Sequence, residues 1–284
     1  MFEWATALAF SQKHNVPVVF CTLPGVTSRM SEFKTSEKFE IRSSEGIQSS
    51  RSRLAKFLRK VNLESGITNI QTEQGLNFQE LIYGEFRNYH GYFQSWRYFH
   101  AVRDFLVSEF ELKSPSSSYF ELKDSLPKNF TGIHIRRGGP GAAVLTTDYH
   151  GLLDVEYYKR AIALNARLGG SNQYVVFTDN PSKARETIDS LNLENTRIVG
   201  PQDTQSQCEN LHLMTQSSSF IGANSSYSWW ATYLNVNLKT QPIFPRQWYM
   251  NPDLSNNDML LPDWISIGFD KFLNEEIGRG VSLG

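Results

Sequence analysis

The chain has 284 residues, with 28 Lys and Arg against 29 Asp and Glu, so its formal net charge is −1. This balance argues against a nucleic-acid binder that depends on bulk attraction to phosphates, although a local basic face would not show in it. The two cysteines, Cys21 and Cys208, are too few for a disulfide framework or a four-ligand zinc site. No stretch has the roughly 18 apolar residues of a membrane helix, and residues 1–10 lack the basic region of a signal peptide.

The first elements along the chain are a helix and a strand. Ala, Leu and Phe at helical spacing predict a helix over residues 1–14, and the apolar run at 16–20 predicts a buried strand. A helix followed by a buried strand is half of a β-α-β unit. We expect the strand that would precede this helix to be absent from the chain.

The middle of the chain has less regular patterns. Residues 24–50 show no clear period and are expected to form an irregular loop region. The basic segment 51–61 is interpreted as the solvated face of a short helix rather than as a patch that binds nucleic acid or a membrane. Nine aromatic residues lie between 83 and 105, and for most of them we favour packing in a core or at a domain junction. The polar stretch 114–118 is the best candidate for a linker.

Strands and helices alternate beyond this linker. Strands are expected at 130–135, 173–178, 196–199, 219–222 and 242–244, with helices at 155–168, 182–191, 210–216 and 226–235. This alternation predicts an α/β fold with a parallel, doubly wound sheet. Ligands of such sheets bind beyond the carboxyl ends of the strands, so motifs that follow strands are where chemistry is expected.

The first of these strands ends in a motif with two arginines. Alternation along the strand places His134 and Arg136 on one face and Arg137 on the other, and glycines follow directly. Two guanidiniums beside a flexible backbone make a candidate site for a phosphate or diphosphate. The alternative is that both arginines form surface ion pairs, which contribute little.

Two later strand ends carry polar residues. Asp179 would accept hydrogen bonds from a nucleotide base or ribose, or would cap the helix that follows it. Ser225 and Ser226 stand where a helix begins, and the free amides there would bind an anion, although an ordinary serine cap is the alternative. The tryptophans at 229 and 230 are expected in the core.

Motifs for a bound metal and for P-loop chemistry are missing. The chain contains no D-x-D pair, no H-E-x-x-H and no G-x-x-x-x-G-K-[ST] loop. Phosphate binding without these motifs predicts a transferase for sugar nucleotides in which arginines replace the cation. We therefore expect no metal and no cofactor.

A series of short segments runs along nearly the whole chain. They are Met1-Phe2-Glu3-Trp4-Ala5, Gly91-Tyr92-Phe93-Gln94-Ser95 with Tyr98-Phe99, His134-Ile135-Arg136-Arg137-Gly138, His150-Gly151, Tyr157-Tyr158 with Ala161-Ile162, Glu209-Asn210-Leu211, residues 223–230, Pro245-Arg246-Gln247-Trp248 and Pro262-Asp263-Trp264-Ile265. In this order they resemble glycosyltransferase family 11, the inverting α-1,2-fucosyltransferases that use GDP-L-fucose without a metal.

The sequence departs from this family at two places. The aspartate that ends the family's H-x-R-R-x-D motif falls on Gly139, so the usual ordering acid of the loop is absent. The chain starts at the methionine that follows the family's G-G-L-G-N-Q segment, so we expect that glycine turn and the strand before it to be missing.

The resemblance implies a GT-B-like fold with two Rossmann-like halves. Residues 1–112 would be an acceptor-side half that lacks its first strand, and residues 113–284 would bind the GDP-sugar. Arg136 would neutralise charge on the leaving diphosphate, and His134 would contact the sugar donor or orient the arginine. The residues expected at the sugar-donor site are His134, Arg136, Arg137, Asp179, Glu209, Asn224, Ser225 and Ser226.

The implied reaction transfers L-fucose from GDP-β-L-fucose to the 2-hydroxyl of a terminal galactoside, with inversion. Tyr92, Phe93 and Gln94 would line the acceptor side, and the base is left open between three candidates, namely Asp148, His150 and Asp154. The expected partners are GDP-fucose and a galactose-containing oligosaccharide, with no nucleic acid. We expect a cytoplasmic enzyme of bacterial type, held at a membrane surface if its glycan acceptor is lipid-linked.

Two alternatives remain open. One is a protein that binds GDP-fucose or a glycan with impaired catalysis, which the glycine at 139 favours. The other is a GDP-fucose transferase that modifies a different hydroxyl or a protein.

Overall fold

The chain folds into two compact units. The computed structural model describes residues 1–22, 29–34, 40–43, 70–84, 88–138, 150–251, 254, 258–268 and 272–273. One unit is Met1–Lys113 with Asn256–Met259, and the other is Ser114–Ser255 with Leu260–Gly284. Both contain helices and parallel strand pairs, which confirms the predicted α/β class. No helix among the described residues is long and apolar enough to cross a membrane.

The first unit contains α1 and two small parallel sheets. The predicted first helix is confirmed as α1 (Phe2–His14), which ends at Asn15 in the left-handed conformation with φ of 52°. The strand pairs are β1 (Val19–Thr22) with β2 (Glu40–Ser43), and β3 (Ile70–Thr72) with β4 (Asn88–His90). The shorter helices are η1 (Arg29–Glu32), η3 (Trp96–Tyr98), η4 (His100–Val102) and α3 (Arg103–Glu109).

The strand after α1 differs from the prediction. It begins at Val19 rather than at residue 16, because Pro17 has no N–H to donate to a strand ladder. Val19 is 38% exposed, so the expectation of a buried strand is wrong at this position. The basic segment 51–61 lies outside the described residues.

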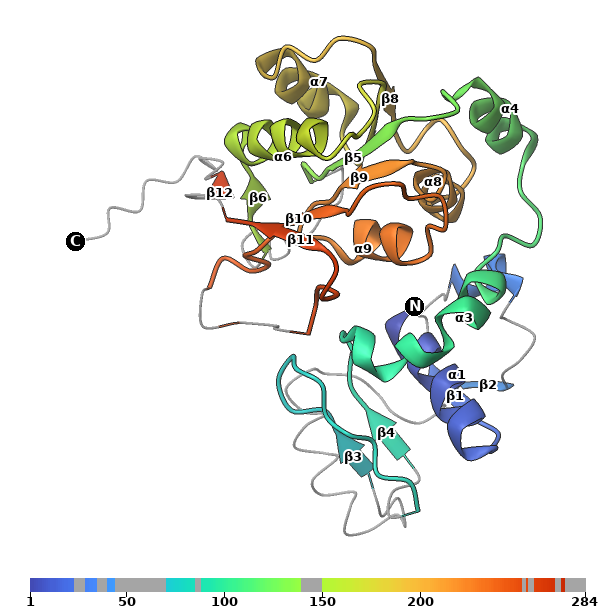
Figure 1. Ribbon diagram of the computed structural model, residues 1–284. Helices are drawn as coiled ribbons and strands as arrows, with labels where there is room; N and C mark the ends of the chain where they lie inside the picture. The colour runs from blue at the N-terminus through green and yellow to red at the C-terminus, as the bar shows by residue number, and fades with distance from the viewer. Residues whose placement is uncertain are drawn as a thin grey trace, which may run out of the picture. The chain divides into compact units, whose positions relative to one another are not determined.

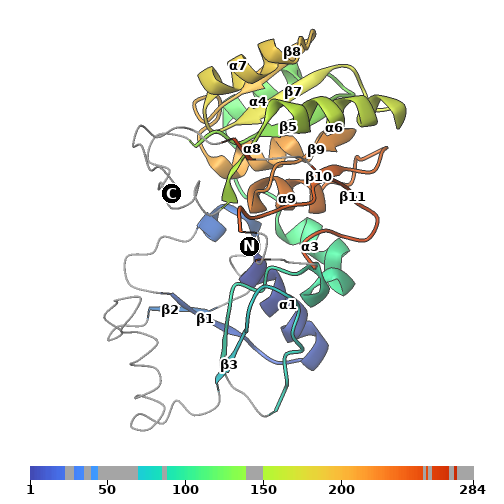
Figure 2. The ribbon, with the colours of Figure 1, turned by 90° about the vertical axis from the view of Figure 1, so that its left-hand side faces the viewer.

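The second unit is built around a parallel sheet of six strands (Figures 1 and 2). The strands are β5 (Thr131–Ile135), β7 (Tyr174–Thr178), β8 (Thr196–Val199), β9 (Ser219–Ile221), β10 (Ile243–Pro245) and β11 (Ile265–Ile267). Their spatial order is β11-β10-β9-β5-β7-β8, so the chain starts in the middle, runs to one edge, and then returns to build the other side. This is the order of a Rossmann sheet.

Helices cover both faces of this sheet. They are α4 (Ser117–Ser125), α6 (Val155–Arg167), α7 (Pro181–Ser190), α8 (Gln207–Met214) and α9 (Ser226–Tyr233). Figure 1 shows α6 and α7 on one face and α8 and α9 on the other. This distribution follows from right-handed crossovers, because the direction of strand addition reverses after β8.

Several element boundaries differ from the sequence-based expectations. The expected linker at 114–118 is shorter, because the Ser116 hydroxyl accepts from the Tyr119 amide at 3.2 Å and starts α4 at Ser117. In the same way Ser206 caps α8, which begins at Gln207 rather than at residue 210. The alternation did not predict β11, nor the short antiparallel pair β6 (Leu152–Leu153) and β12 (Phe272–Leu273).

Aromatic residues fix the core of the second unit. Trp229 and Trp230 are 0% and 2% exposed, which confirms their predicted place in the core. Tyr157 and Tyr158 of α6 are fully buried as well. The Tyr157 hydroxyl donates to the Gly222 carbonyl at 2.6 Å, just beyond β9, and the Tyr158 hydroxyl donates to a carbonyl at the end of β5. These two bonds hold neighbouring strand ends in place.

Candidate functional site

The carboxyl ends of β5, β7 and β9 lie side by side at one edge of the sheet. Ile135 pairs with Thr178 across β5 and β7, and Ile133 pairs with Ile221 across β5 and β9. The order of strand addition reverses between β5 and β9, and open α/β sheets bind their ligands at this switch point. Three of the predicted motifs follow these three strands, so the fold brings them to one edge.

His134 is buried at the end of β5. It is 4% exposed, its ring lies 5.7 Å from the Tyr227 ring of α9, and its Nδ1 has no hydrogen-bond partner among the described residues. The pKa of His134 is lowered to about 4, mainly by burial; the charge of Asp179 opposes this shift and the charge of Arg136 adds to it. His134 is therefore a neutral imidazole at physiological pH.

Arg136 follows directly beyond the strand and is half-buried. Within the part of the chain that the structure describes, its guanidinium makes no hydrogen bond and no ion pair. Burial lowers its pKa, and the carboxylate of Asp179 acts in the opposite direction and favours the charged form. A charged, half-buried guanidinium at a switch point is suited to bind a diphosphate.

Arg137 points to the other face of the sheet, as strand alternation predicts. It is 5% exposed, and its guanidinium donates to the Leu153 carbonyl at 2.8 Å and to the Thr187 hydroxyl at 3.0 and 3.3 Å. It also lies 5.7 Å from the centre of the Tyr158 ring. These contacts indicate that Arg137 braces the loop against α6 and α7, while its expected role in sugar-donor binding stays a prediction.

Asp179 holds the backbone of the arginine loop. Its Oδ1 accepts from the Arg137 amide at 2.7 Å, and its Oδ2 accepts from the Gly138 amide at 3.0 Å. The alternative role of capping α7 is filled by Asn180, whose side chain accepts from the Lys183 amide at 3.3 Å. The carboxylate of Asp179 is thus directed at the loop, and its binding of a nucleotide stays a prediction.

The segment after β9 is held from several sides. Asn224 is 1% exposed, and its amide donates to the carbonyls of His150 and Trp248 at 2.5 and 3.3 Å. Ser225 caps α9 by accepting from the Tyr227 amide at 3.3 Å. Ser226 lies in the first turn of α9 and is exposed. Their predicted contacts with the sugar donor are not tested by these bonds.

Glu209 is buried in the first turn of α8. Its carboxylate accepts from the Ser116 amide at 2.6 Å, from the Ser116 hydroxyl at 3.0 Å and from the Gln205 amide at 2.9 Å. It therefore ties the start of α4 to α8. The contacts found are structural, and the role predicted at the sugar-donor site stays a prediction.

The three candidates for the base that deprotonates the acceptor hydroxyl differ in their contacts. The pKa of His150 is lowered by burial and by the nearby charge of Arg136, and the ring lies 5.3 Å from that of Tyr249. Asp154 caps α6, with its Oδ1 accepting from the Tyr157 amide at 2.8 Å. The third candidate, Asp148, lies outside the described residues, as does Gly139.

The predicted acceptor-side residues belong to the first unit. Tyr92 is 71% exposed, Phe93 is 6% exposed, and Gln94 is half-buried. A residue that sequence reasoning missed organises this loop: the Glu73 carboxylate accepts from the Tyr92 and Phe93 amides at 2.9 and 2.8 Å and from the Tyr98 hydroxyl at 3.1 Å. Glu73 lies 19 positions before Tyr92, and no local pattern indicates this contact.

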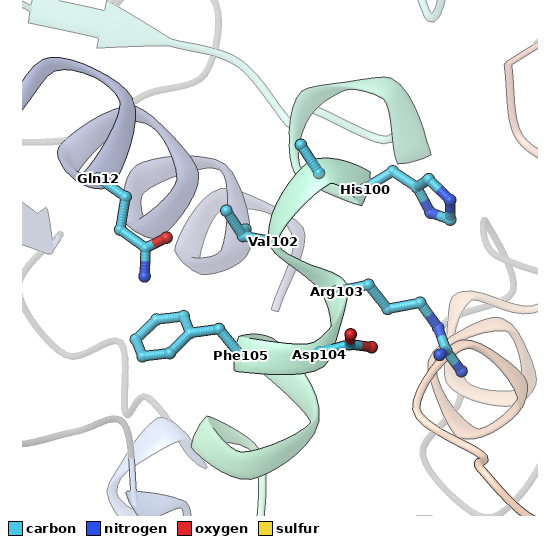
Figure 3. A pocket seen from close by; sticks show the side chains of 7 residues that line it. Gln12, His100, Val102, Arg103, Asp104 and Phe105 are labelled. Atoms are coloured by element: carbon cyan, nitrogen blue, oxygen red, sulfur yellow. The ribbon is translucent and has the colours of Figure 1, made fainter.

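The first unit also has an open hollow of about 500 Å³ between α1 and α3 (Figure 3). Gln12, Val102 and Phe105 point toward one another across it, whereas His100 and Arg103 point away. None of the residues predicted from the sequence as site residues lines this hollow.

Metal ligands do not gather in the described parts of either unit. No group of three or more His, Cys, Asp or Glu side chains among the described residues is placed to hold a metal ion. The expectation that no metal or other cofactor takes part stays a prediction.

The sequence matches the profile of glycosyl transferase family 11 over residues 33–268. The O-antigen biosynthesis glycosyltransferase WbnK of Escherichia coli is 30% identical over 49% of this chain and 45% of its own length. The galactoside 2-alpha-L-fucosyltransferase Sec1 of Mus musculus is 24% identical over 70% of this chain and 56% of its own. An alpha-1,2-colitosyltransferase of Escherichia coli is 28% identical over 62% of this chain and 61% of its own. The chain thus spans about half to three-fifths of the length of these relatives.

Solved structures are also similar at low sequence identity. A glycosyl transferase of family 9 from Veillonella parvula gives a TM-score of 0.46 at 10% identity, covering 95% of this chain and 84% of that one. POFUT1 in complex with GDP-fucose gives a TM-score of 0.40 at 11% identity, covering 85% and 92%.

Proposed function

Because the chain belongs to glycosyl transferase family 11, we propose that it transfers L-fucose from GDP-β-L-fucose to the 2-hydroxyl of a terminal galactoside, with inversion and without a metal. The relatives named as galactoside 2-alpha-L-fucosyltransferase and galactoside alpha-(1,2)-fucosyltransferase support the transfer of fucose and the galactoside acceptor. The observation that carries the proposal is the pair of side chains at the end of β5. Arg136 offers a charged guanidinium there, beside the buried, neutral His134.

The chemistry follows from what these groups can bind. The bond between fucose and the β-phosphate breaks as the acceptor oxygen attacks, and negative charge grows on the departing GDP. A guanidinium already in place at that position stabilises the charge by about 2.7–4 kcal/mol, or about 10²- to 10³-fold in rate. His134 lies two residues before Arg136 on the same strand end, and in this proposal its imidazole contacts the sugar donor or orients the arginine.

The acceptor hydroxyl must lose its proton to a base. His150, Asp148 and Asp154 stay candidates, and we favour His150, because its lowered pKa leaves the imidazole neutral, which is the form that can accept a proton. Asp154 already uses a carboxylate oxygen to cap α6.

A transfer assay tests this proposal. GDP release is measured with GDP-fucose and lactose for the wild type, Arg136→Ala and Arg136→Lys, with the exposed Arg185 of α7 changed to Ala as the matched control. We expect Arg136→Ala to lose at least 100-fold in kcat, Arg136→Lys to lose less, and Arg185→Ala to keep the wild-type rate. EDTA should leave the rate unchanged.

Several results would contradict this proposal. Wild-type activity in Arg136→Ala would show that the guanidinium is not needed for transfer. Activity that is lost in EDTA and restored by Mn²⁺ would show that the reaction needs a metal. Transfer from a GDP-colitose donor in place of GDP-fucose would favour the specificity of the colitosyltransferase relative. Binding of GDP-fucose without any turnover would favour the alternative of an impaired binding protein.

A further inference from the structure

We propose that Asp179 is a positioning residue, whose carboxylate fixes the backbone around Arg136 and thereby sets where the Arg136 guanidinium points. The inference rests on the proposed function, in which that guanidinium meets the diphosphate. It assigns to Asp179 a role on the protein side of the loop, in place of the direct contact with a nucleotide that the sequence predicts.

The sheet brings Asp179 to the right place. Thr178 pairs with Ile135 in the β5–β7 ladder, so the residues that follow these two, Asp179 and Arg136, leave neighbouring strands at the same level. The carboxylate then reaches past Arg136 to the amides that follow it. Its two oxygens accept one amide each, at 2.7 and 3.0 Å.

The turn after Arg136 is shaped to bind an anion, and Asp179 supplies that anion. Gly138 has a φ of 70°, a left-handed conformation that directs consecutive amides of a turn toward one side. The amides of Arg137 and Gly138 are both used by the carboxylate of Asp179. These two amides are therefore not free to bind a phosphate at this strand end, and in this proposal the Arg136 side chain meets it.

The residues on both sides of Arg136 are held as well. The Tyr158 hydroxyl donates to the His134 carbonyl at 3.1 Å, and the Arg137 guanidinium is fixed by the Leu153 carbonyl. Asp179 completes this frame by holding the backbone between β5 and the Arg137 side chain. Because an error of about 1 Å in the position of a catalytic group costs about 100-fold in rate, such a frame controls catalysis without touching the substrate.

The test is a double-mutant cycle with GDP as the ligand. Asp179→Asn keeps one acceptor oxygen and turns an NH₂ group toward the second amide, so it loses one of the two bonds, and Asp179→Ala loses both. We expect kcat/KM to fall about tenfold in Asp179→Asn and about 100-fold in Asp179→Ala. GDP affinity, measured by calorimetry, should fall in both when Arg136 is present, and should not change further when Asp179→Asn is added to Arg136→Ala.

Hydrogen exchange measures the hold on the loop without any substrate. The amides of Arg137 and Gly138 should exchange at least tenfold faster in Asp179→Asn than in the wild type, when both are measured well below their midpoints of thermal unfolding. Asp189→Asn is the matched control, because it removes the same charge from an exposed site on α7 and should change neither exchange nor affinity.

Two outcomes would overturn the inference. If Asp179→Asn weakens GDP binding by the same factor with and without Arg136, the carboxylate contacts the ligand itself. If exchange of the two amides does not change, Asp179 does not hold the loop. A wild-type protein that neither transfers fucose nor binds GDP would refute the proposed function instead, and the exchange experiment would still decide whether Asp179 holds the loop.

Discussion

Replacing Arg137 by alanine should destabilise the second unit, although the adjacent Arg136→Ala should not. The Arg137 side chain is 5% exposed and makes hydrogen bonds to the Leu153 carbonyl and the Thr187 hydroxyl. Arg136 is half-buried, and its guanidinium has no hydrogen-bond partner among the described residues. The two arginines are neighbours in the sequence, and strand alternation predicts that they face opposite sides of the sheet.

The size of the effect follows from the bonds that are lost. A hydrogen bond to a charged group contributes about 1.5–3 kcal/mol, and Arg137→Ala removes such bonds to both Leu153 and Thr187. Thr187 keeps its own bond to the Lys183 carbonyl at 3.2 Å, and removing a buried charge relieves part of its desolvation cost. We therefore expect a loss of about 3 kcal/mol in the free energy of unfolding, against less than about 0.5 kcal/mol for Arg136→Ala.

Urea denaturation of the two variants and the wild type measures this difference. Tryptophan fluorescence follows the unfolding of the second unit through Trp229 and Trp230, which are buried in its core, and Trp4 and Trp96 add a signal from the first unit. Arg137→Lys is an informative third variant, since one ammonium cannot reproduce the forked contacts of a guanidinium and should recover only part of the loss. Equal stability of Arg136→Ala and Arg137→Ala would refute the assignment of the two arginines to opposite faces.

Two further predictions concern the first unit and the buried histidine. Glu73→Ala removes the acceptor of the Tyr92 and Phe93 amides, so it should lower the unfolding free energy of the first unit by about 2 kcal/mol and raise the KM for lactose. An unchanged urea midpoint and KM would show that Glu73 does not organise the loop. Because the pKa of His134 is about 4 in the folded chain and 6.5 in a free side chain, its stabilising contribution is complete above pH ~6.5 and is lost as the pH falls toward ~4. The thermal midpoint of the wild type should therefore fall more between pH 7.5 and 5 than that of His134→Gln, and equal falls would contradict the lowered pKa.

The sequence was informative where the pattern is local. Alternating apolar strands and amphipathic helices predicted the parallel sheet of the second unit from β5 to β10, because each element shows its own period within a few residues. Strand alternation also predicted that His134 and Arg137 face opposite sides, and the structure places one against Tyr227 and the other against Thr187. The motif series further predicted the family that the profile match shows.

The spacing of apolar residues was less informative about where helices and strands begin and end. Ser116 and Ser206 each start a helix at a place that the apolar period does not mark. The two-residue strands β6 and β12 exist because they pair with each other across more than 100 positions, and neither is long enough to show a period of its own.

Only the tertiary structure decided what the polar candidates contact. The sequence placed Asp179, Glu209 and Asn224 at strand or helix ends and predicted a sugar-donor site for each. In the structure they bind backbone groups 42, 93 and 74 positions away, which are respectively the Arg137 amide, the Ser116 amide and the His150 carbonyl. A carboxylate or an amide binds whichever complementary group the fold brings near, and that group has no fixed spacing along the chain. The sequence by itself therefore determined the family, the sheet and the strand end where Arg136 lies, whereas the frame that holds Arg136 became visible only when distant segments were brought together.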